Sequence, residues 1–107
     1  MELLKLKRKV EKYYRNNVKG NKNISYDQIR RKMTRNMLLA KKENSTGYPC
    51  QLYKYGSLWF LVKDGKVVWM RNKCKVPEDW TLDKVKYNEL NKELGIEEDE
   101  KIEVINE

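Results

Sequence analysis

The sequence predicts an α+β fold of one domain, with two N-terminal helices, a small antiparallel β-sheet around a central β-hairpin, and a C-terminal helix. Three observations predict it. Apolar residues recur at helical spacing over 3–18 and 26–42. Residues 48–71 are rich in the aromatic and β-branched types that favour strands, and helical spacing returns over 82–94.

The two N-terminal segments are typical of amphipathic helices. The first places Leu3, Leu6, Val10, Tyr13 and Tyr14 on one face. The second opens with Ser25 and Gln28 at capping-box spacing. Its apolar stripe is Tyr26, Ile29, Met33, Met37 and Ala40. Arg31, Arg35 and Lys42 lie opposite the stripe, so we expect them to face solvent.

The clearest β signal is a hairpin. Asp64-Gly65 separates the apolar segments 58–63 and 66–71, and this dipeptide favours a two-residue turn. Counting outward from the turn gives the pairs Val62–Val67, Phe60–Trp69 and Leu58–Arg71. We therefore expect Phe60 and Trp69 in the core and Trp59 more exposed on the other face. A strand over 48–55 precedes the hairpin.

The C-terminal part is predicted as one helix and a tail. Trp80 and Thr81 suit a hydrophobic staple and an N-cap, and Gly95 suits a helix end. We assign residues 1–96 to the domain, because 107 residues provide for one core. The acidic remainder, 97–107, alternates like a short strand near its end and matches no calcium loop.

Composition excludes several classes of protein. The chain has no His, which removes His-based catalysis and most catalytic zinc sites. Cys50 and Cys74 form no CxxC motif, so we expect buried thiols in a reducing, cytoplasmic compartment. No apolar run reaches the roughly 20 residues that span a membrane. We expect no metal, no cofactor and no membrane partner.

Positive charge is concentrated in the N-terminal part. Residues 1–42 hold 14 Lys or Arg against 3 Asp or Glu, whereas residues 43–107 hold 10 against 13. A helix surface that only faces solvent normally carries both positive and negative side chains. This excess of positive charge therefore favours an anionic partner, and DNA or RNA is the first candidate. Trp59 beside hairpin lysines suits stacking on unpaired bases. The expected nucleic-acid-binding residues are Arg8, Lys12, Arg15, Arg30, Arg31, Arg35, Lys42, Trp59, Lys63 and Lys66.

Other functions stay open. A protein-binding inhibitor or adaptor, or a homodimer, would use Leu38, Leu39, Trp59 and Met70 as anchors. Basic helices followed by a hairpin also suit a winged helix-turn-helix, although 18–24 is longer than the usual turn. The Lys- and Asn-rich, Ala-poor composition fits a small viral protein, from a phage or another mobile element.

One enzymatic hypothesis comes from a resemblance. The segment YKYGSLWFLVKDGKVVWMRN resembles the paired C-terminal strands of the RelE/ParE toxin superfamily. The family's leading strand and its characteristic Arg are not evident, and Leu58, Trp59 and Phe60 stand at the Arg position. The resemblance implies a toxin that cleaves RNA, with Lys54, Tyr55, Arg71 and Lys73 as candidates for acid–base work and phosphate stabilisation. Apart from this resemblance, we expect that the protein is not an enzyme.

Overall fold

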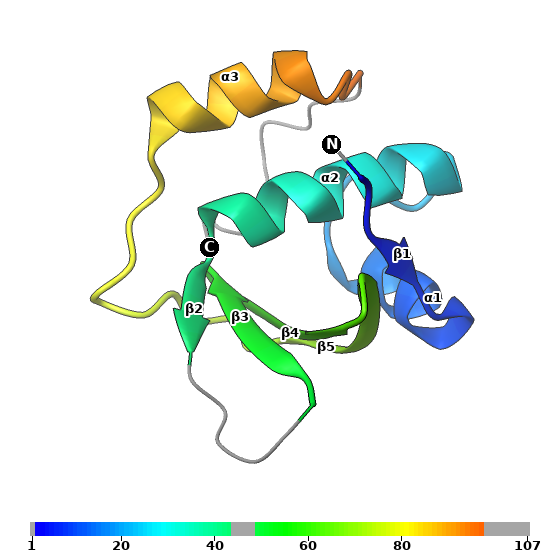
Figure 1. Cartoon of the computed structure of the whole chain (residues 1–107), viewed down its shortest axis with the longest axis horizontal. Helices are drawn as coiled ribbons and strands as arrows, with labels where there is room; N and C mark the ends of the chain where they lie inside the picture. Colours follow the sequence, from blue (N-terminus) through cyan, green and yellow to red (C-terminus); the bar gives the residue numbers. More distant parts are fainter. Residues whose placement is uncertain (1, 44–48, 98–107) are drawn as a thin grey trace.

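The computed structural model describes residues 2–43 and 49–97, and it combines helices with a five-stranded mixed sheet (Figure 1). The elements in chain order are β1 (Lys5–Leu6), α1 (Arg8–Asn17), α2 (Tyr26–Leu39), β2 (Lys41–Glu43), β3 (Gln51–Tyr55), β4 (Leu58–Lys63), β5 (Lys66–Asn72) and α3 (Lys84–Glu93). The strand order is β1-β5-β4-β3-β2, with β1 parallel to β5 and the other neighbours antiparallel. The predicted small antiparallel sheet after two N-terminal helices is therefore wrong, because strands also form before α1 and directly after α2.

The two additional strands come from segments predicted as helix ends. Leu4 and Leu6 are buried with Lys5 exposed between them, which is the alternation of a strand. The backbone N–H groups of Lys5 and Lys7 donate to carbonyl oxygens at the start of β5, at 2.9 and 3.1 Å. At the other place, α2 ends at Leu39 and the following residues pair with β3 as β2. Strand hydrogen bonds outweigh helical spacing at both places, and at β1 the burial of Leu4 and Leu6 adds to them.

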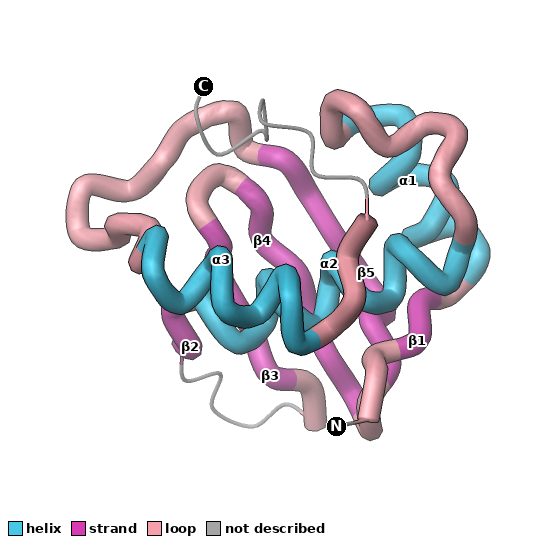
Figure 2. Tube along the Cα trace, turned by 90° about the horizontal axis from the view of Figure 1, so that it is seen from above, coloured by secondary structure: helices cyan, strands magenta, loops and turns pink. Residues whose placement is uncertain are grey.

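The helices that cover the sheet lie on one side of it. α2 packs on the sheet, and α3 packs on α2 as a further layer (Figures 1 and 2). α1 lies beside β5, close to β1. The core between helices and sheet includes Tyr14, Ile29, Met33, Phe60 and Val67. The opposite face of the sheet carries none of the described helices.

The polar side of α2 is buried in part, by the loop that precedes the helix and by α3. Lys32 and Arg35 are both 0% exposed. The Lys32 ammonium donates to Asn21 Oδ1 at 2.8 Å. The Arg35 guanidinium donates to Asn91 Oδ1 at 3.1 Å and lies 4.6 Å from the centre of the Tyr87 ring. The expectation that Arg35 faces solvent is therefore wrong, because α3 covers this side of α2.

The hairpin turn is confirmed. Asp64 and Gly65 have φ angles of 49° and 76°, and positive values at both central positions define a type I′ turn. Lys63 and Lys66 pair across the turn. The turn residues therefore place the two strands next to each other, as the dipeptide predicts.

The predicted pair Val62–Val67 is confirmed, but the predicted pairs Phe60–Trp69 and Leu58–Arg71 are wrong, because β5 contains a β-bulge. Val68 is an extra residue opposite the boundary of Leu61 and Val62, and it shifts the register by one. The pairs beyond it are Leu61–Trp69, Phe60–Met70, Trp59–Arg71 and Leu58–Asn72. Met70 consequently lies in the core, and Trp69 lies on the same face as Trp59.

Helix ends follow the sequence in part. Ser25 caps α2, since its Oγ accepts the Gln28 N–H at 3.1 Å. The cap of α3 is Asp83 rather than Thr81, because the Asp83 carboxylate accepts a backbone N–H of the first turn. Gly95 ends α3 as predicted, with a φ of 66° that favours glycine.

Arg35→Ala tests the polar layer between α2 and α3. We expect the free energy of unfolding to fall by about 2–4 kcal/mol, because buried hydrogen bonds to a charged group are lost and a cavity forms. Urea unfolding followed by circular dichroism measures this change. Lys84→Ala, at an exposed position of α3, is the control and should shift stability by less than about 0.5 kcal/mol. Equal midpoints for the two variants would contradict the proposed role of Arg35.

Candidate nucleic-acid interface

We call the sheet face opposite the helices the open face. Alternate residues of all the strands form it, and none of these residues is buried. They are Lys5 from β1, Lys66, Trp69 and Arg71 from β5, Trp59, Leu61 and Lys63 from β4, Leu52 and Lys54 from β3, and Lys41 and Glu43 from β2. The open face therefore combines aromatic and aliphatic side chains with many cations and one carboxylate.

Trp59 is flanked by lysines on the open face. The Lys54 Nζ lies 4.1 Å and the Lys73 Nζ lies 4.7 Å from the centre of a Trp59 ring. Lys54 comes from β3 and Lys73 from the chain directly after β5, and these strands lie on opposite sides of β4. Cation–π attraction favours this arrangement. The indole is therefore held on the face and surrounded by positive charge.

Each tryptophan of the open face forms a wall of a hollow. One hollow, of about 150 Å³, lies between Val68, Trp69 and Met70 of β5 and Lys9, Val10 and Tyr13 of α1. A wider hollow, of about 690 Å³, lies between Trp59 and the segment 73–79. The first hollow depends on the bulge, which turns Trp69 away from the core. Sequence reasoning missed Trp69 for this reason.

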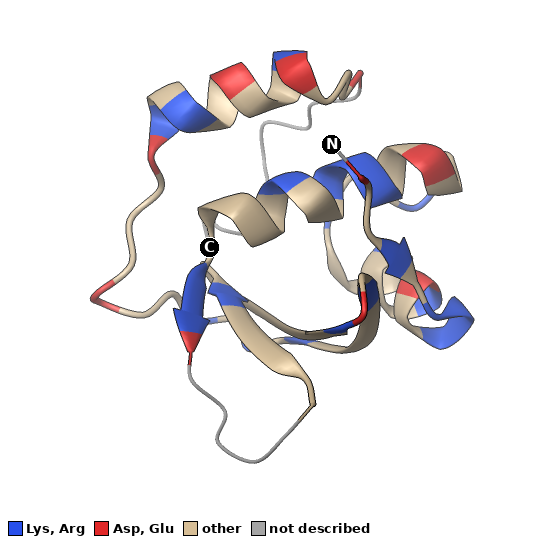
Figure 3. Ribbon diagram, viewed as in Figure 1, with Lys and Arg blue, Asp and Glu red and all other residues tan. Residues whose placement is uncertain are grey.

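Three lysines meet where the hairpin turns. Lys66 lies opposite Lys63 in β4 and opposite Lys5 in β1. Within the described residues, none of the three forms an ion pair. Arg8 and Lys9 are exposed at the start of α1, which follows β1 directly, and Figure 3 shows this concentration of Lys and Arg. Like charges opposite each other destabilise a sheet, so this corner favours an anionic ligand.

The predicted nucleic-acid-binding residues separate into two groups. The accessible group is Arg8, Lys12, Lys42, Lys63 and Lys66, which are exposed, and Trp59, which is half-buried. For these residues binding stays a prediction. The other group is Arg15, Arg30, Arg31 and Arg35, which are half-buried or buried.

Arginines of the second group stabilise the fold. Arg15 donates to carbonyl oxygens of the loop between α1 and α2. Arg30 donates to the carbonyl oxygens of the two residues that precede Lys5, at 2.8 and 3.3 Å. Arg31 pairs with Asp27 at 2.7 Å and donates to a carbonyl oxygen at the end of α3. These guanidinium groups join separate segments of the chain, which leaves them little freedom to contact a ligand.

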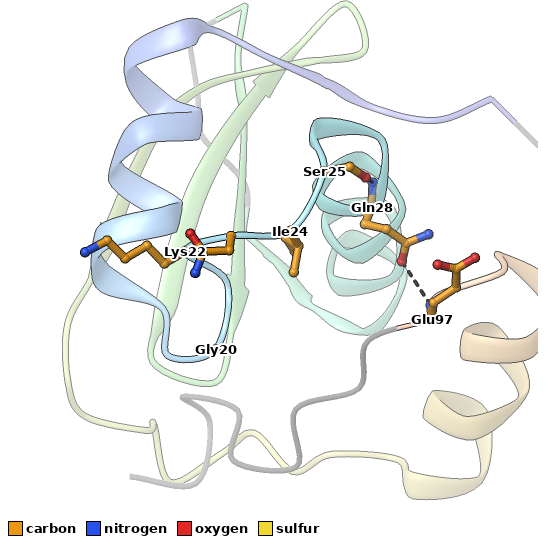
Figure 4. A pocket seen from close by; sticks show the side chains of 7 residues that line it. Gly20, Lys22, Ile24, Ser25, Gln28 and Glu97 are labelled. Carbon is orange, nitrogen blue, oxygen red and sulfur yellow. Dashed lines mark hydrogen bonds between the residues drawn. The ribbon is translucent and has the colours of Figure 1, made fainter.

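Another hollow lies at the N-terminus of α2 (Figure 4). Its lining includes Gly20, Lys22, Ile24, Ser25, Gln28 and Glu97. The Gln28 Oε1 accepts the Glu97 N–H at 2.9 Å, and its Nε2 donates to the Gly95 carbonyl at 3.1 Å. Gln28 therefore links α2 to the chain after α3, which is a structural role. The rest of the predicted acidic tail and its short strand, at 98–107, lie outside the described residues.

The sheet separates the residues that an RNA-cleaving toxin would need together. Lys54 and Arg71 lie on the open face, with Lys73 beside Trp59. Tyr55 pairs with Leu58, faces the core and is 1% exposed. Its hydroxyl cannot act with the other three on one phosphate in this arrangement.

The residues that a protein-binding adaptor or a winged helix-turn-helix would use are only partly accessible. Of the predicted protein-binding anchors, Met70 is buried and Leu39 half-buried, whereas Leu38 is 37% exposed. A winged helix-turn-helix would insert α2 in the major groove of DNA. α2 is enclosed between the sheet and α3, so this docking mode is not available.

The segment after β5 is held against β2 by an ion pair. The Asp79 carboxylate contacts the Lys41 ammonium, and this hydrogen bond lowers the pKa of Asp79 and raises that of Lys41. Cys50 is half-buried, but Cys74 is exposed, so the prediction of two buried thiols is wrong for Cys74. Within 2–43 and 49–97, no group of three or more Cys, Asp or Glu is placed to hold a metal.

Comparisons with known proteins point to one family. A family model described as YorE matches residues 4–93. The SPbeta prophage-derived protein YorE of Bacillus subtilis (strain 168) is 39% identical over 106 residues, which cover 92% of this chain and 86% of the relative. No solved structure matches. In the part of the chain that the structure describes, no helix is long and apolar enough to cross a membrane.

Ion-selective quenching tests the charge around Trp59. In a variant with Trp69→Phe and Trp80→Phe, we expect iodide to quench the remaining fluorescence much more than caesium, because Lys54 and Lys73 attract anions. Adding Lys54→Gln and Lys73→Gln should reduce the iodide quenching at least twofold. Acrylamide, which is neutral, controls for exposure. Equal quenching by iodide and caesium would contradict the observed lysine positions.

Proposed function

Because this chain belongs to the YorE family, a similar member of which derives from a prophage, we propose that it is a small nucleic-acid-binding protein of phage origin. The proposed contact surface is the open face together with the exposed first turns of α1. The protein acts by binding alone, without cutting the nucleic acid. One observation carries the proposal, namely two tryptophans among clustered cations on a sheet face that no described helix covers.

The balance of charge on the open face supports a polyanion as ligand. Its cations include Lys54, Arg71 and the lysines at the hairpin turn, whereas its carboxylate is Glu43. Glu43 lies 3.5 Å from Lys41 and 3.9 Å from Lys54, so it offsets only part of the charge. The remaining cations would contact phosphates and release counterions.

α1 extends this surface beyond the sheet. Arg8 and Lys12 are exposed, and Lys9 lies at the hollow beside Trp69. Lys42 is exposed on β2 but pairs with Tyr53, so it lies on the helix side of the sheet, and Lys41 is the β2 cation of the open face. A strand of nucleic acid that crosses the open face would meet cations at both sides of the sheet. This revises the predicted interface, which relied on the outer faces of both N-terminal helices.

A protein partner is the second candidate function. Leu38 in α2 and Val85 in α3 are exposed apolar residues. Two such residues form a small apolar surface compared with the cores of stable protein interfaces. We therefore favour nucleic acid, and the binding experiment separates the two.

Salt dependence tests the proposed function. With protein freed of nucleic acid, fluorescence anisotropy of labelled oligonucleotides should give an affinity that falls steeply as salt rises. The slope of log K against log[salt] should be about −0.7 per contacted phosphate on single strands. Lys54→Ala with Lys73→Ala should reduce its magnitude by about 1.4.

Lys84→Ala with Lys92→Ala is the matched control, because it removes the same charge from exposed positions of α3. It should leave the slope nearly unchanged. Equal effects of both double variants would mean that only net charge matters, and the open face would lose its assigned role. Absence of binding to any oligonucleotide would refute the proposed function.

Integrity of the nucleic acid tests binding without cleavage. After prolonged incubation with the protein, labelled RNA should keep its length on a denaturing gel, since Tyr55 is buried away from Lys54 and Arg71. A shortened RNA whose cleavage disappears in Arg71→Ala, with binding retained, would instead establish a ribonuclease.

A further inference from the structure

We infer that the open face binds unpaired strands of DNA and RNA alike, with little base preference, by seating one base against Trp59 and another against Trp69. This inference rests on the proposed nucleic-acid-binding function and specifies its substrate class. It follows from the placement of the two indoles, the hollows beside them, the cations around them and the residue types that the face lacks.

The spacing of the two indoles favours a strand with free bases. Trp69 pairs with Leu61 and Arg71 with Trp59, so the tryptophans are diagonal neighbours on adjacent strands. The residue positions of such neighbours lie about 7–8 Å apart, whereas stacked bases rise by about 3.4 Å along a duplex strand. A strand whose bases are free to separate can follow this wider spacing. In a duplex the base faces are covered and cannot make these contacts.

The hollow beside Trp69 has room for a flat ring. Its volume of about 150 Å³ is similar to that of protein cavities that hold benzene. Val10 and Met70 give it apolar walls, the Trp69 indole offers stacking area, and Lys9 supplies a cation at the rim. A base seated here would place its phosphate towards Lys9 and the exposed turn of α1.

The hollow beside Trp59 is wider, and Lys73, one of the two lysines that contact the ring, lines it. A base that stacks on Trp59 replaces one of these ammonium groups, and the displaced lysine then reaches the neighbouring phosphate. Asp79 at the rim is already paired with Lys41, so it contributes little repulsion. Glu78 is exposed at the same rim, so its carboxylate can turn into solvent, away from a bound phosphate.

The strand positions of the open face lack the amide and hydroxyl side chains that read base edges, and its Lys and Arg side chains, which can also read guanine, are the groups that would contact phosphates. Its strand positions are aromatic, aliphatic, Lys, Arg and one Glu, without Asn, Gln, Ser or Thr. Amide and hydroxyl side chains read base edges, and they also contact the 2′-hydroxyl that separates RNA from DNA. Stacking on indoles accepts every base, since each has a π-face. The surface therefore suits binding that tolerates any sequence.

The test compares 20-nucleotide probes in one anisotropy assay at fixed salt: oligo-dT, oligo-dA, oligo-rU, and a mixed-sequence single strand with its duplex. We expect the single strand to bind at least tenfold more tightly than its duplex, and the single-stranded probes to agree within about fivefold. Trp59→Ala and Trp69→Ala should each weaken single-strand binding about tenfold, while the salt slope stays unchanged. Trp59→Phe and Trp69→Phe should lose less, because a ring is kept.

Val85→Ala is the matched control, since Val85 is 69% exposed on α3, away from the open face. Circular dichroism shows whether each variant is folded. If an alanine variant does not fold, the corresponding phenylalanine variant still tests the role of the ring. Duplex binding as tight as single-strand binding, or tryptophan variants without effect, would overturn the inference and leave the proposed function standing. A more than tenfold preference for one base or for RNA over DNA would overturn the claim of sequence tolerance. If none of the probes binds, both the inference and the proposed function are refuted.

Discussion

The burial of α2 on two sides determines the arrangement of the whole molecule. Its apolar stripe packs on the sheet, and Arg35, which is fully buried on its polar side, packs under α3. A buried guanidinium is costly without partners, and α3 supplies Tyr87 and Asn91. α3 therefore lies on α2 and not on the free side of the sheet. Exposure of the open face is a direct consequence of this layer order.

The β-bulge at Val68 determines what the open face presents. It moves Met70 into the core and turns Trp69 outwards, next to Trp59 and Leu61. An indole has more apolar area to bury than a Met side chain, so this exchange reduces the hydrophobic stabilisation of the core. The bulge therefore leaves the Trp69 indole half-buried on the open face, where the binding proposed above would use it.

The sequence predicts features that local chemistry decides. The start of α2 at its Ser25 cap, the Asp64-Gly65 turn and the end of α3 at Gly95 are confirmed. Features decided by tertiary contacts could not be predicted in the same way. Lys5–Leu6 is too short a strand to show a period, and residues 67–70 are all apolar, so no alternation reveals the bulge. Of the surface that we propose for binding, the sequence singles out Trp59 and the hairpin lysines but not Trp69.

The arginines show why positive charge on the two N-terminal helices does not by itself predict an exposed surface. A charged side chain is usually exposed, so a basic helix side predicts a surface. Arg15, Arg30 and Arg31 instead donate to backbone carbonyls of other segments, a task that suits the rigid, multi-donor guanidinium. On the open face the cations are mostly lysines, whose flexible, hydrated ammonium groups suit phosphate contacts that require no fixed geometry. Net charge alone therefore overstates the accessible basic surface, and the division between internal arginines and exposed lysines is the reason that we propose the sheet as the contact surface.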